Sequence, residues 1–184
     1  GKGTDQSIAL AQAIVQGHPT RYYMPNQYEN EANFLAHYER TGPEIWRATR
    51  GKLTHLFAGI GTGGTVTGAG LYLKERNSQV KVYAVEAQTN HHLQGLRNLE
   101  ESSMPKVLER HAELVDEWIR VSDVRAFEAV RELGRDHNLL VGPSSAAVYS
   151  AAKEVAQRVA KGNFVLIFGD DGRKFMSLYT QFKV

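Results

Sequence analysis

Residues 59–68, Gly59-Ile60-Gly61-Thr62-Gly63-Gly64-Thr65-Val66-Thr67-Gly68, decide how this chain folds. An apolar run at residues 53–58 precedes this stretch, and the residues through Leu73 that follow it are compatible with a helix. A strand, a glycine-rich turn and a helix in this order are typical of an anion site. The glycines let backbone N–H groups converge, and the helix N-terminus adds a partial positive charge. The sequence therefore predicts a phosphate site at the start of this helix.

The same stretch also matches a dinucleotide fingerprint. Gly59, Gly61 and Gly64 satisfy the pattern G-x-G-x-x-G. A second apolar run, residues 80–85, ends at Glu86, about where a ribose-binding carboxylate is expected. Taken alone, this pattern favours NAD.

Three hydroxyl groups in the same turn favour a different ligand. Thr62, Thr65 and Thr67 supply side-chain donors, which suit a terminal phosphate with many acceptor oxygens. A dinucleotide pyrophosphate is bound mainly by bare backbone, and its fingerprint usually opens a domain, whereas this motif begins at residue 59. These two details argue against a dinucleotide.

The composition is that of an ordinary globular protein. The chain has 184 residues, enough for one domain or for one large domain and part of another, and 42% of them are hydrophobic. The net charge is +2, and the basic and acidic residues are interspersed. No block of like charge therefore suggests a nucleic-acid-binding face. No cysteine is present for a disulfide, a thiolate metal site or a nucleophile, and the adjacent His91 and His92 do not form a metal set. We expect a soluble, cytoplasmic protein without a membrane span or a metal site.

Hydrophobic periodicity predicts an α/β fold: a mostly parallel sheet with helices on both faces, in three layers. The expected strands are residues 21–24, 53–58, 80–85, 118–121, 139–141 and 164–168. The expected helices are residues 5–16, 30–41, 44–48, 66–75, 123–133 and 144–159. Periodicity is poor at residues 88–115, where we expect a binding loop.

Five segments together resemble, in order, the fold type II PLP-dependent enzymes of the cysteine synthase and cystathionine β-synthase family. The segments are Asn26-Gln27-Tyr28-Glu29-Asn30, Thr41-Gly42-Pro43-Glu44-Ile45-Trp46, the glycine stretch, Val141-Gly142-Pro143-Ser144-Ser145-Ala146 and Gly169-Asp170-Asp171-Gly172-Arg173-Lys174-Phe175-Met176-Ser177. The similarity covers essentially the whole chain and implies the large PLP-binding domain of such an enzyme. PLP then displaces NAD as the expected cofactor.

The resemblance implies cofactor contacts at both ends of PLP. Gly61, Thr62, Gly63, Gly64 and Thr65 would cradle its phosphate.

At the other end, Ser144 would contact the pyridine nitrogen. A hydroxyl can hydrogen-bond that nitrogen but does not hold it protonated as a carboxylate would, which gives a weaker electron sink. The alternative is that Ser144 is only the N-cap of the helix that follows. Ala146 stands where the family usually has glycine, which adds a methyl group near the site.

The resemblance also implies substrate contacts. Gln27 matches a glutamine that helps to hold the substrate carboxylate, and Gly95 lies in a mobile loop that closes over the bound substrate. The segment that contains Arg97 resembles the corresponding segment in the branch of the family that accepts O-phosphoserine, and a guanidinium suits a phosphate leaving group. The alternative is that Arg97 is a solvent-facing arginine. Asp170 and Asp171 are expected to structure a turn near the cofactor rather than to act as acid and base.

The family's Schiff-base lysine lies in an amino-terminal segment, and no lysine of this chain sits in that motif. The chain opens at Gly1-Lys2-Gly3-Thr4 without a methionine. We therefore expect residues 1–184 to be the carboxy-terminal major part of the enzyme, with no catalytic residue of its own. Alone, it should bind PLP weakly and catalyse nothing.

The parent activity that the resemblance implies is that of a cysteine synthase. Such a transferase/lyase of cysteine biosynthesis would replace the leaving group of O-acetylserine or O-phosphoserine with sulfide, and would work as a homodimer. One alternative is cystathionine β-synthase, which uses homocysteine. Another is a non-catalytic PLP- or phosphate-binding module, or a subunit that needs a partner.

Overall fold

The computed structural model describes residues 2–184, with side chains described from Thr4 onward. Its strands are β1 (His55–Gly59), β2 (Lys81–Ala87), β3 (Glu117–Val121) and β4 (Phe164–Leu166). Its α-helices are α1 (Lys2–Gly17), α2 (Glu31–Ala36), α3 (Gly42–Ala48), α4 (Gly64–Arg76), α5 (Lys106–Glu109), α6 (Asp123–His137), α7 (Pro143–Ala156) and α8 (Met176–Gln181). A π-helical turn, η1 (His37–Thr41), joins α2 to α3, and two 3₁₀ turns are η2 (Ala112–Leu114) and η3 (Gly172–Phe175).

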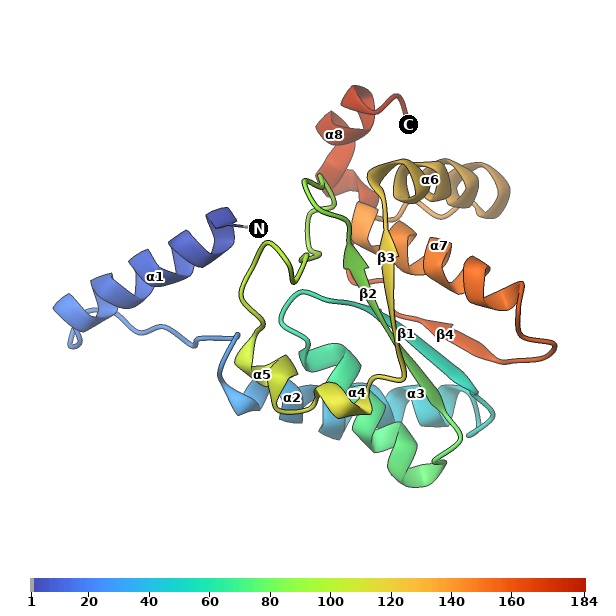
Figure 1. Ribbon diagram of the computed structural model, residues 1–184, viewed down its shortest axis with the longest axis horizontal. Helices are drawn as coiled ribbons and strands as arrows, with labels where there is room; N and C mark the ends of the chain where they lie inside the picture. The colour runs from blue at the N-terminus through green and yellow to red at the C-terminus, as the bar shows by residue number, and fades with distance from the viewer. Residues whose placement is uncertain (1) are drawn as a thin grey trace.

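The four strands form one parallel sheet in the order β3-β2-β1-β4, as Figure 1 shows. The chain builds the sheet outward from β1 through β2 to β3 and then crosses to the opposite side for β4. The order therefore reverses between β1 and β4, and in open α/β sheets ligands bind beyond the carboxyl ends of the strands at such a point.

Alternating side chains of the strands fill a core on each face of the sheet. Leu56 and Val82 pack on the face that α3 and α4 cover, whereas Phe57 and Tyr83 pack on the face that α6 and α7 cover. The rings of Phe57 and Tyr83 stack with their centroids 4.4 Å apart. These two cores confirm the expected three-layer α/β fold.

Three local expectations were wrong. Residues 21–24 form no strand, and residues 139–141 contribute only one antiparallel bridge, between Val141 and Asp171. The helix expected at 30–41 becomes π-helical from His37 onward, and the chain continues through Gly42 and Pro43 into α3 without a break. Pro43 is accommodated because it lies in the first turn of α3, where its missing N–H is not needed.

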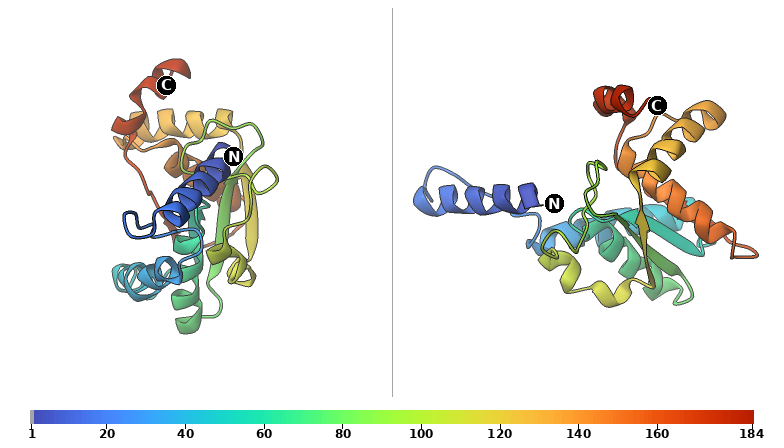
Figure 2. Two further views of the ribbon diagram at one scale, coloured as in Figure 1. Left: turned by 90° about the vertical axis from the view of Figure 1, so that its left-hand side faces the viewer. Right: turned by 45° about the horizontal axis from the view of Figure 1, so that its top comes forward.

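Helix α1 stands away from the sheet in Figure 1 and in the right-hand view of Figure 2. It carries the exposed apolar side chains Leu10 and Ile14. None of the helices within residues 2–184 is long and apolar enough to cross a membrane.

Candidate cofactor site

A cavity of about 440 Å³ lies at the carboxyl ends of β1 and β4, where the strand order reverses. Ala58 and Gly59 line it from β1, and Ile167 and Gly169 line it from the segment after β4. The sequence-predicted residues that line it are Gln27, Gly61, Thr62, Gly63, Thr65, Gly95 and Ser144. The structure therefore gathers residues from five distant parts of the sequence around one space.

The glycine loop has a backbone that only glycine fits. Gly63 has φ = +86°, and a Cβ atom there would lie 2.5 Å from the Cβ of Leu108. At Gly64, a Cβ would lie 2.1 Å from the side-chain oxygen of Asn33. Gly64 does not line the cavity with its neighbours but begins α4, so the loop places the N-terminus of α4 at the cavity.

The hydroxyl of Thr62 is held by a residue that sequence reasoning missed. Asn33 Nδ2 donates to Thr62 Oγ1 at 2.8 Å and to the backbone oxygen of Gln27 at 2.8 Å. One amide group thereby ties the Gln27 segment to the glycine loop. Asn33 follows the quoted segment Asn26–Asn30 by three residues, and nothing in the sequence pattern signals its position.

The hydroxyl of Thr65 is held by a second missed residue, His37. Its Nε2 lies 3.1 Å from Thr65 Oγ1, and its Nδ1 lies 3.0 Å from Thr41 Oγ1. His37 begins the π-helical turn η1, and such turns occur frequently at functional sites. Burial lowers the pKa of His37, which favours the neutral imidazole with one donor and one acceptor nitrogen.

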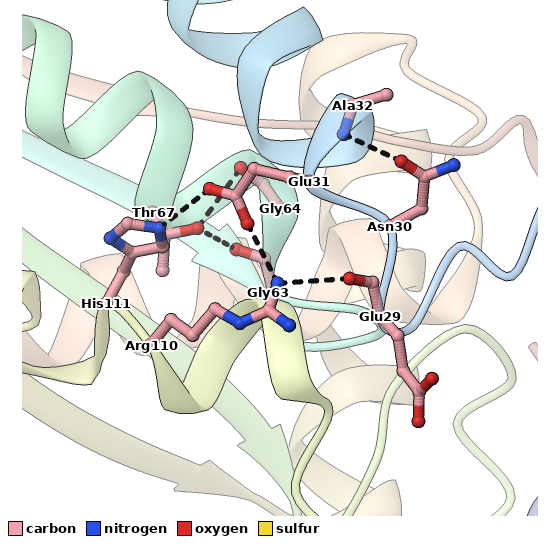
Figure 3. Close-up of polar contacts among 9 residues, drawn as sticks. All are labelled: Glu29, Asn30, Glu31, Ala32, Gly63, Gly64, Thr67, Arg110 and His111. Atoms are coloured by element: carbon pink, nitrogen blue, oxygen red, sulfur yellow. Dashed lines mark hydrogen bonds and ion pairs between the residues drawn. The ribbon is translucent and has the colours of Figure 1, made fainter.

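The third hydroxyl of the loop faces inward. Thr67 is fully buried and its Oγ1 donates to the carbonyl of Gly63 at 2.8 Å, which braces the first turn of α4 (Figure 3). Three cavity-facing threonines were expected from the sequence, and the structure supplies two.

An ion-pair cluster holds α2 against the α5 segment beside the glycine loop (Figure 3). Arg110 Nη1 donates to the carbonyl of Glu29 at 3.1 Å and pairs with the Glu31 carboxylate at 3.0 Å. His111 Nε2 lies 3.1 Å from the other Glu31 oxygen. The pKa of Glu31 is lowered, mainly by the hydrogen bond with His111 and to a smaller extent by the hydrogen bond from Arg110, although burial opposes this shift. Because α2 carries Asn33, this cluster also positions the residue that holds Thr62.

Ser144 lies on the other side of the cavity and is not the N-cap of α7. The cap position is Gly142, and Ser144 is in the first turn. Its Oγ donates to Asp170 Oδ2 at 2.9 Å, and the Ser145 hydroxyl donates to Asp170 Oδ1. Asp171, by contrast, accepts from the N–H of Arg173 and caps η3.

Arg97 does not line the cavity. Its side chain is buried, its Nη2 lies 2.9 Å from the Asp5 carboxylate, and its Nη1 donates to the carbonyl of Ser103 at 2.7 Å. The guanidinium also lies over the Tyr28 ring, 4.7 Å from its centroid. The alternative of a solvent-facing arginine does not hold either, because Arg97 joins α1 to the irregular loop (residues 88–115).

Gly95 does line the cavity, with φ = +92°. A Cβ at this position would lie 3.4 Å from Ser144 Oγ. A side chain here would be strained by the positive φ and would occupy the space beside Ser144, so glycine keeps this side of the cavity open.

The carboxylate that a dinucleotide would need is already engaged. Glu86 is buried in β2 and accepts hydrogen bonds from Arg120 Nε at 2.6 Å and from the N–H of Leu99 at 3.2 Å. Glu86 therefore fastens the irregular loop to the sheet, and no ribose contact is left for it.

The donors at the cavity fit a phosphate monoester. The glycine loop brings a helix N-terminus and two hydroxyls together and contains no carboxylate. At Gly61, a Cβ would lie 3.1 Å from the carbonyl oxygen of Gly95, so the bare backbone leaves room for a ligand. Among residues 4–184, no lysine lines this cavity, and no group of three or more His, Asp or Glu side chains is placed to hold a metal ion.

Residues 1–170 match the model of the pyridoxal-phosphate dependent enzyme family. The chain belongs to this family, and its cofactor is pyridoxal 5′-phosphate (PLP). The phosphate expected from the glycine loop is therefore that of PLP, and the NAD interpretation is set aside.

Sequence relatives narrow the comparison. The chain is 38% identical to a cysteine synthase of Aquifex aeolicus over 181 residues. The aligned region covers 96% of this chain and 55% of the relative. It is 33% identical to cysteine synthase B of Salmonella typhimurium, over 83% of this chain and 50% of the relative. It is also 34% identical to a cystathionine beta-synthase of Apis mellifera, over 94% of this chain and 37% of the relative. The chain thus spans about half the length of the two cysteine synthases, and less of the third relative.

Solved structures show the same architecture. O-acetylserine sulfhydrylase isoform 3 of Entamoeba histolytica superposes with a TM-score of 0.85 at 28% identity, over 96% of this chain and 55% of that protein. A variant of O-ureido-L-serine synthase with O-ureido-L-serine bound superposes with a TM-score of 0.88 at 25% identity, over 98% and 58%.

Proposed function

We propose that this chain supplies the phosphate-binding loop and the pyridine contact of a PLP-dependent cysteine synthase. The enzyme that contains it would replace the leaving group of O-acetylserine or O-phosphoserine with sulfide, as a homodimer in the cytoplasm. The observation that carries the proposal is the single cavity where the glycine loop and Ser144 face one another. The cysteine synthase relatives support the reaction type.

The residues around the cavity divide the work of binding. When bound, PLP supplies the electron sink for loss of an α proton and a β leaving group. The N–H groups of residues 61–65 and the hydroxyls of Thr62 and Thr65 hold its phosphate. Gln27 and Gly95 are the cavity residues that we assign to the substrate.

His37 sets the direction of the Thr65 hydroxyl. For Thr65 to donate to a phosphate oxygen, its own oxygen must accept from His37 Nε2–H. The neutral imidazole then has its acceptor at Nδ1, where Thr41 Oγ1 donates. The contacts therefore form one directed chain from Thr41 through His37 to Thr65 and the phosphate.

The choice between an acetate and a phosphate leaving group depends on Arg97. Arg97 suggested O-phosphoserine, but its guanidinium is bound to Asp5 outside the cavity. Arg97 would have to leave this ion pair to reach a substrate phosphate. The similarity to the cystathionine beta-synthase of Apis mellifera supports homocysteine as the alternative second substrate.

Equilibrium dialysis of the chain against PLP, pyridoxal and NAD tests the cofactor assignment. We expect PLP to bind at least about tenfold more tightly than pyridoxal, because the loop contacts the phosphate, and we expect no binding of NAD. Replacing both Thr62 and Thr65 with valine should remove most of this difference. Equal affinity for PLP and pyridoxal would contradict the proposed phosphate site.

The reaction is tested on the longest natural polypeptide that contains this chain. Cysteine formation from sulfide is measured with O-acetylserine and with O-phosphoserine, and cystathionine formation is measured from serine and homocysteine. We expect cysteine formation to dominate. If only cystathionine forms, the alternative holds, and if neither product forms, the binding module holds.

A further inference from the structure

Asn33 holds two parts of the cavity wall with one amide group. Its Nδ2 donates to the backbone carbonyl of Gln27 and to Thr62 Oγ1, in each case at 2.8 Å. A carbonyl only accepts, so the contact with Gln27 identifies which end of the Asn33 amide is the nitrogen. Gln27 and Thr62 both line the cofactor cavity. One planar group therefore sets the spacing between the segment assigned to the substrate and the loop assigned to the phosphate.

The Asn33 amide is itself confined by the start of α4. A Cβ at Gly64 would lie 2.1 Å from Asn33 Oδ1, so glycine lets the amide lie directly against this helix. The N–H of Asn33 donates to the carbonyl of Asn30 at 3.0 Å, which fixes the backbone of Asn33 in the first turn of α2. Because the backbone and the amide oxygen are both confined, a shift of Thr62 changes the direction of the amide and its hydrogen bond to Gln27.

Gln27 lies in an exposed turn that reports how firmly this segment is held. The N–H groups of Glu29 and Asn30 donate to the carbonyl of Asn26 at 3.0 Å and 2.9 Å. Gln27 lies between the donors and the acceptor, and its side chain is exposed. Amides in such a turn exchange their hydrogens with solvent when the turn opens locally. Their exchange rates therefore measure how often the Gln27 segment departs from the position seen in the structure.

Thr62 is the place where a bound phosphate would act on this connection. Its Oγ1 accepts from Asn33 and, at 3.4 Å, from the N–H of Gly64. A phosphate contacted by the Thr62 hydroxyl would confine this side chain to one rotamer. Hydrogen bonds in such a chain polarise and strengthen one another, and the loss of freedom at Thr62 extends through the amide to the Gln27 carbonyl.

We propose that Asn33 is a positioning residue that couples the two halves of the site, so that a phosphate bound at Thr62 orders the Gln27 turn for the substrate. This inference rests on the proposed function, which assigns the phosphate to the glycine loop and the substrate to Gln27. Coupling between two binding sites is reciprocal. A substrate carboxylate held at Gln27 therefore also tightens the binding of the phosphate.

Hydrogen exchange with and without pyridoxine 5′-phosphate tests the coupling. This probe has the ring and phosphate of PLP but an alcohol in place of the aldehyde, so its binding needs no lysine. NMR follows the exchange of the Glu29 and Asn30 amides in the free chain and at a saturating concentration of the probe. We expect saturation to slow both amides by about fivefold or more, the lower end of the usual coupling between two sites.

Three variants locate the connection. Asn33→Leu keeps the approximate shape of the side chain and removes both hydrogen bonds, and Thr62→Val removes only the contact between the loop and the amide. In both variants the ratio of the exchange rates without and with the probe should fall to about one. Thr65→Val is the matched control, because it removes the other hydroxyl of the loop, whose partner is His37. It should need more probe for saturation and then keep the wild-type ratio.

The ratio separates coupling from a merely structural role, because a substitution that only loosens the turn changes both rates and leaves their ratio unchanged. Equal rates with and without the probe in the wild-type chain overturn the proposal, and so does a wild-type ratio in Thr62→Val. Loss of the effect in Thr65→Val also overturns it, since any weakened phosphate contact would then release the turn. If Asn33→Leu does not fold, the comparison of Thr62→Val with Thr65→Val still decides.

The same experiment separates this inference from the proposed function. If pyridoxine 5′-phosphate does not bind to the wild-type chain, the proposed function fails and the inference fails with it. If the probe binds and the two amides exchange as before, the proposed function stands and the inference alone is removed.

Discussion

At the scale of single residues, Gly63 is a position in the glycine loop where a side chain is poorly tolerated. Gly63→Ala would place a side chain at φ = +86° and against Leu108, so we expect a loss of about 2 kcal/mol or more in the free energy of unfolding. Gly134→Ala is the control, because Gly134 lies inside α6 with nothing within 4 Å of an added Cβ. It should stabilise the chain by about 0.5–1 kcal/mol. Urea unfolding of both variants measures this, and changes of the same sign would contradict the argument.

Substituting His37 tests the hydrogen bonds from Thr41 through His37 to Thr65 without altering the glycine loop itself. His37→Leu leaves Thr65 without its partner and should weaken PLP binding by about fivefold, the effect of roughly 1 kcal/mol for one hydrogen bond. His37→Gln carries an amide at the position of Nε2 and should retain most of the affinity. Equilibrium dialysis against PLP compares the two variants. Equal affinities would show that Thr65 needs no donor from this residue.

At the scale of elements, the sequence predicted those whose pattern is local. The strand at β1, the glycine turn and α4 follow from one continuous stretch. The helix expected at 123–133 is present as α6, and Ser122 caps it by accepting from the N–H of Arg125 at 3.3 Å. The π-helical turn was not predictable, because its pattern differs from an α-helix only by the carbonyl that each N–H reaches. Residues 139–141 are apolar enough for a strand, yet their partner, Asp171, permits one bridge only.

Asp5 joins helix α1 to the loop that contains Arg97 and Ser103. Its carboxylate pairs with Arg97 and accepts from the N–H of Ser103 at 2.9 Å. Asp5→Ala should release α1 and expose the segment after it to trypsin at Arg21, with cleavage at least about fivefold faster. Gln16→Ala, at an exposed position of the same helix, should leave the rate unchanged. If Asp5→Ala is cleaved no faster than the control, the Arg97 contact is not what holds α1.

At the scale of the whole molecule, the site was predictable only in part because it is assembled from distant segments. The sequence identified Thr62 and Ser144 since each sits in a motif. Asn33 and His37 carry no motif, and only the packing of α2 and η1 against α4 brings them to the loop. Arg97 misled because a charged residue in a binding loop suggests a ligand, whereas the fold had already paired it with Asp5. Such pairing over 92 positions of sequence depends on the tertiary structure alone.

The pH dependence of stability is also a property of the whole molecule. Burial lowers the pKa of His37, His55 and His91 from the ordinary value of 6.5. Below that value the unfolded chain binds more protons than the folded chain, so the stability from the neutral histidines is complete above pH 6.5 and is lost as the pH falls through it. The Arg173 side chain lowers the pKa of Asp171 to about 2, and stability from this carboxylate is lost only at much lower pH, below its ordinary pKa of 3.8.

We therefore expect Tm to fall between pH 7.5 and pH 5, a range that lies above the ordinary pKa values of Asp and Glu. The fall should be about 3 °C or more, the shift that roughly 1 kcal/mol gives in a chain of this length. Calorimetry at constant ionic strength measures it. The variant His37→Gln should show a shallower fall, because it removes one of the three groups that gain a proton on unfolding. A Tm that is constant over this range, or that rises as the pH falls, would show that the buried histidines do not control the acid limit of the fold.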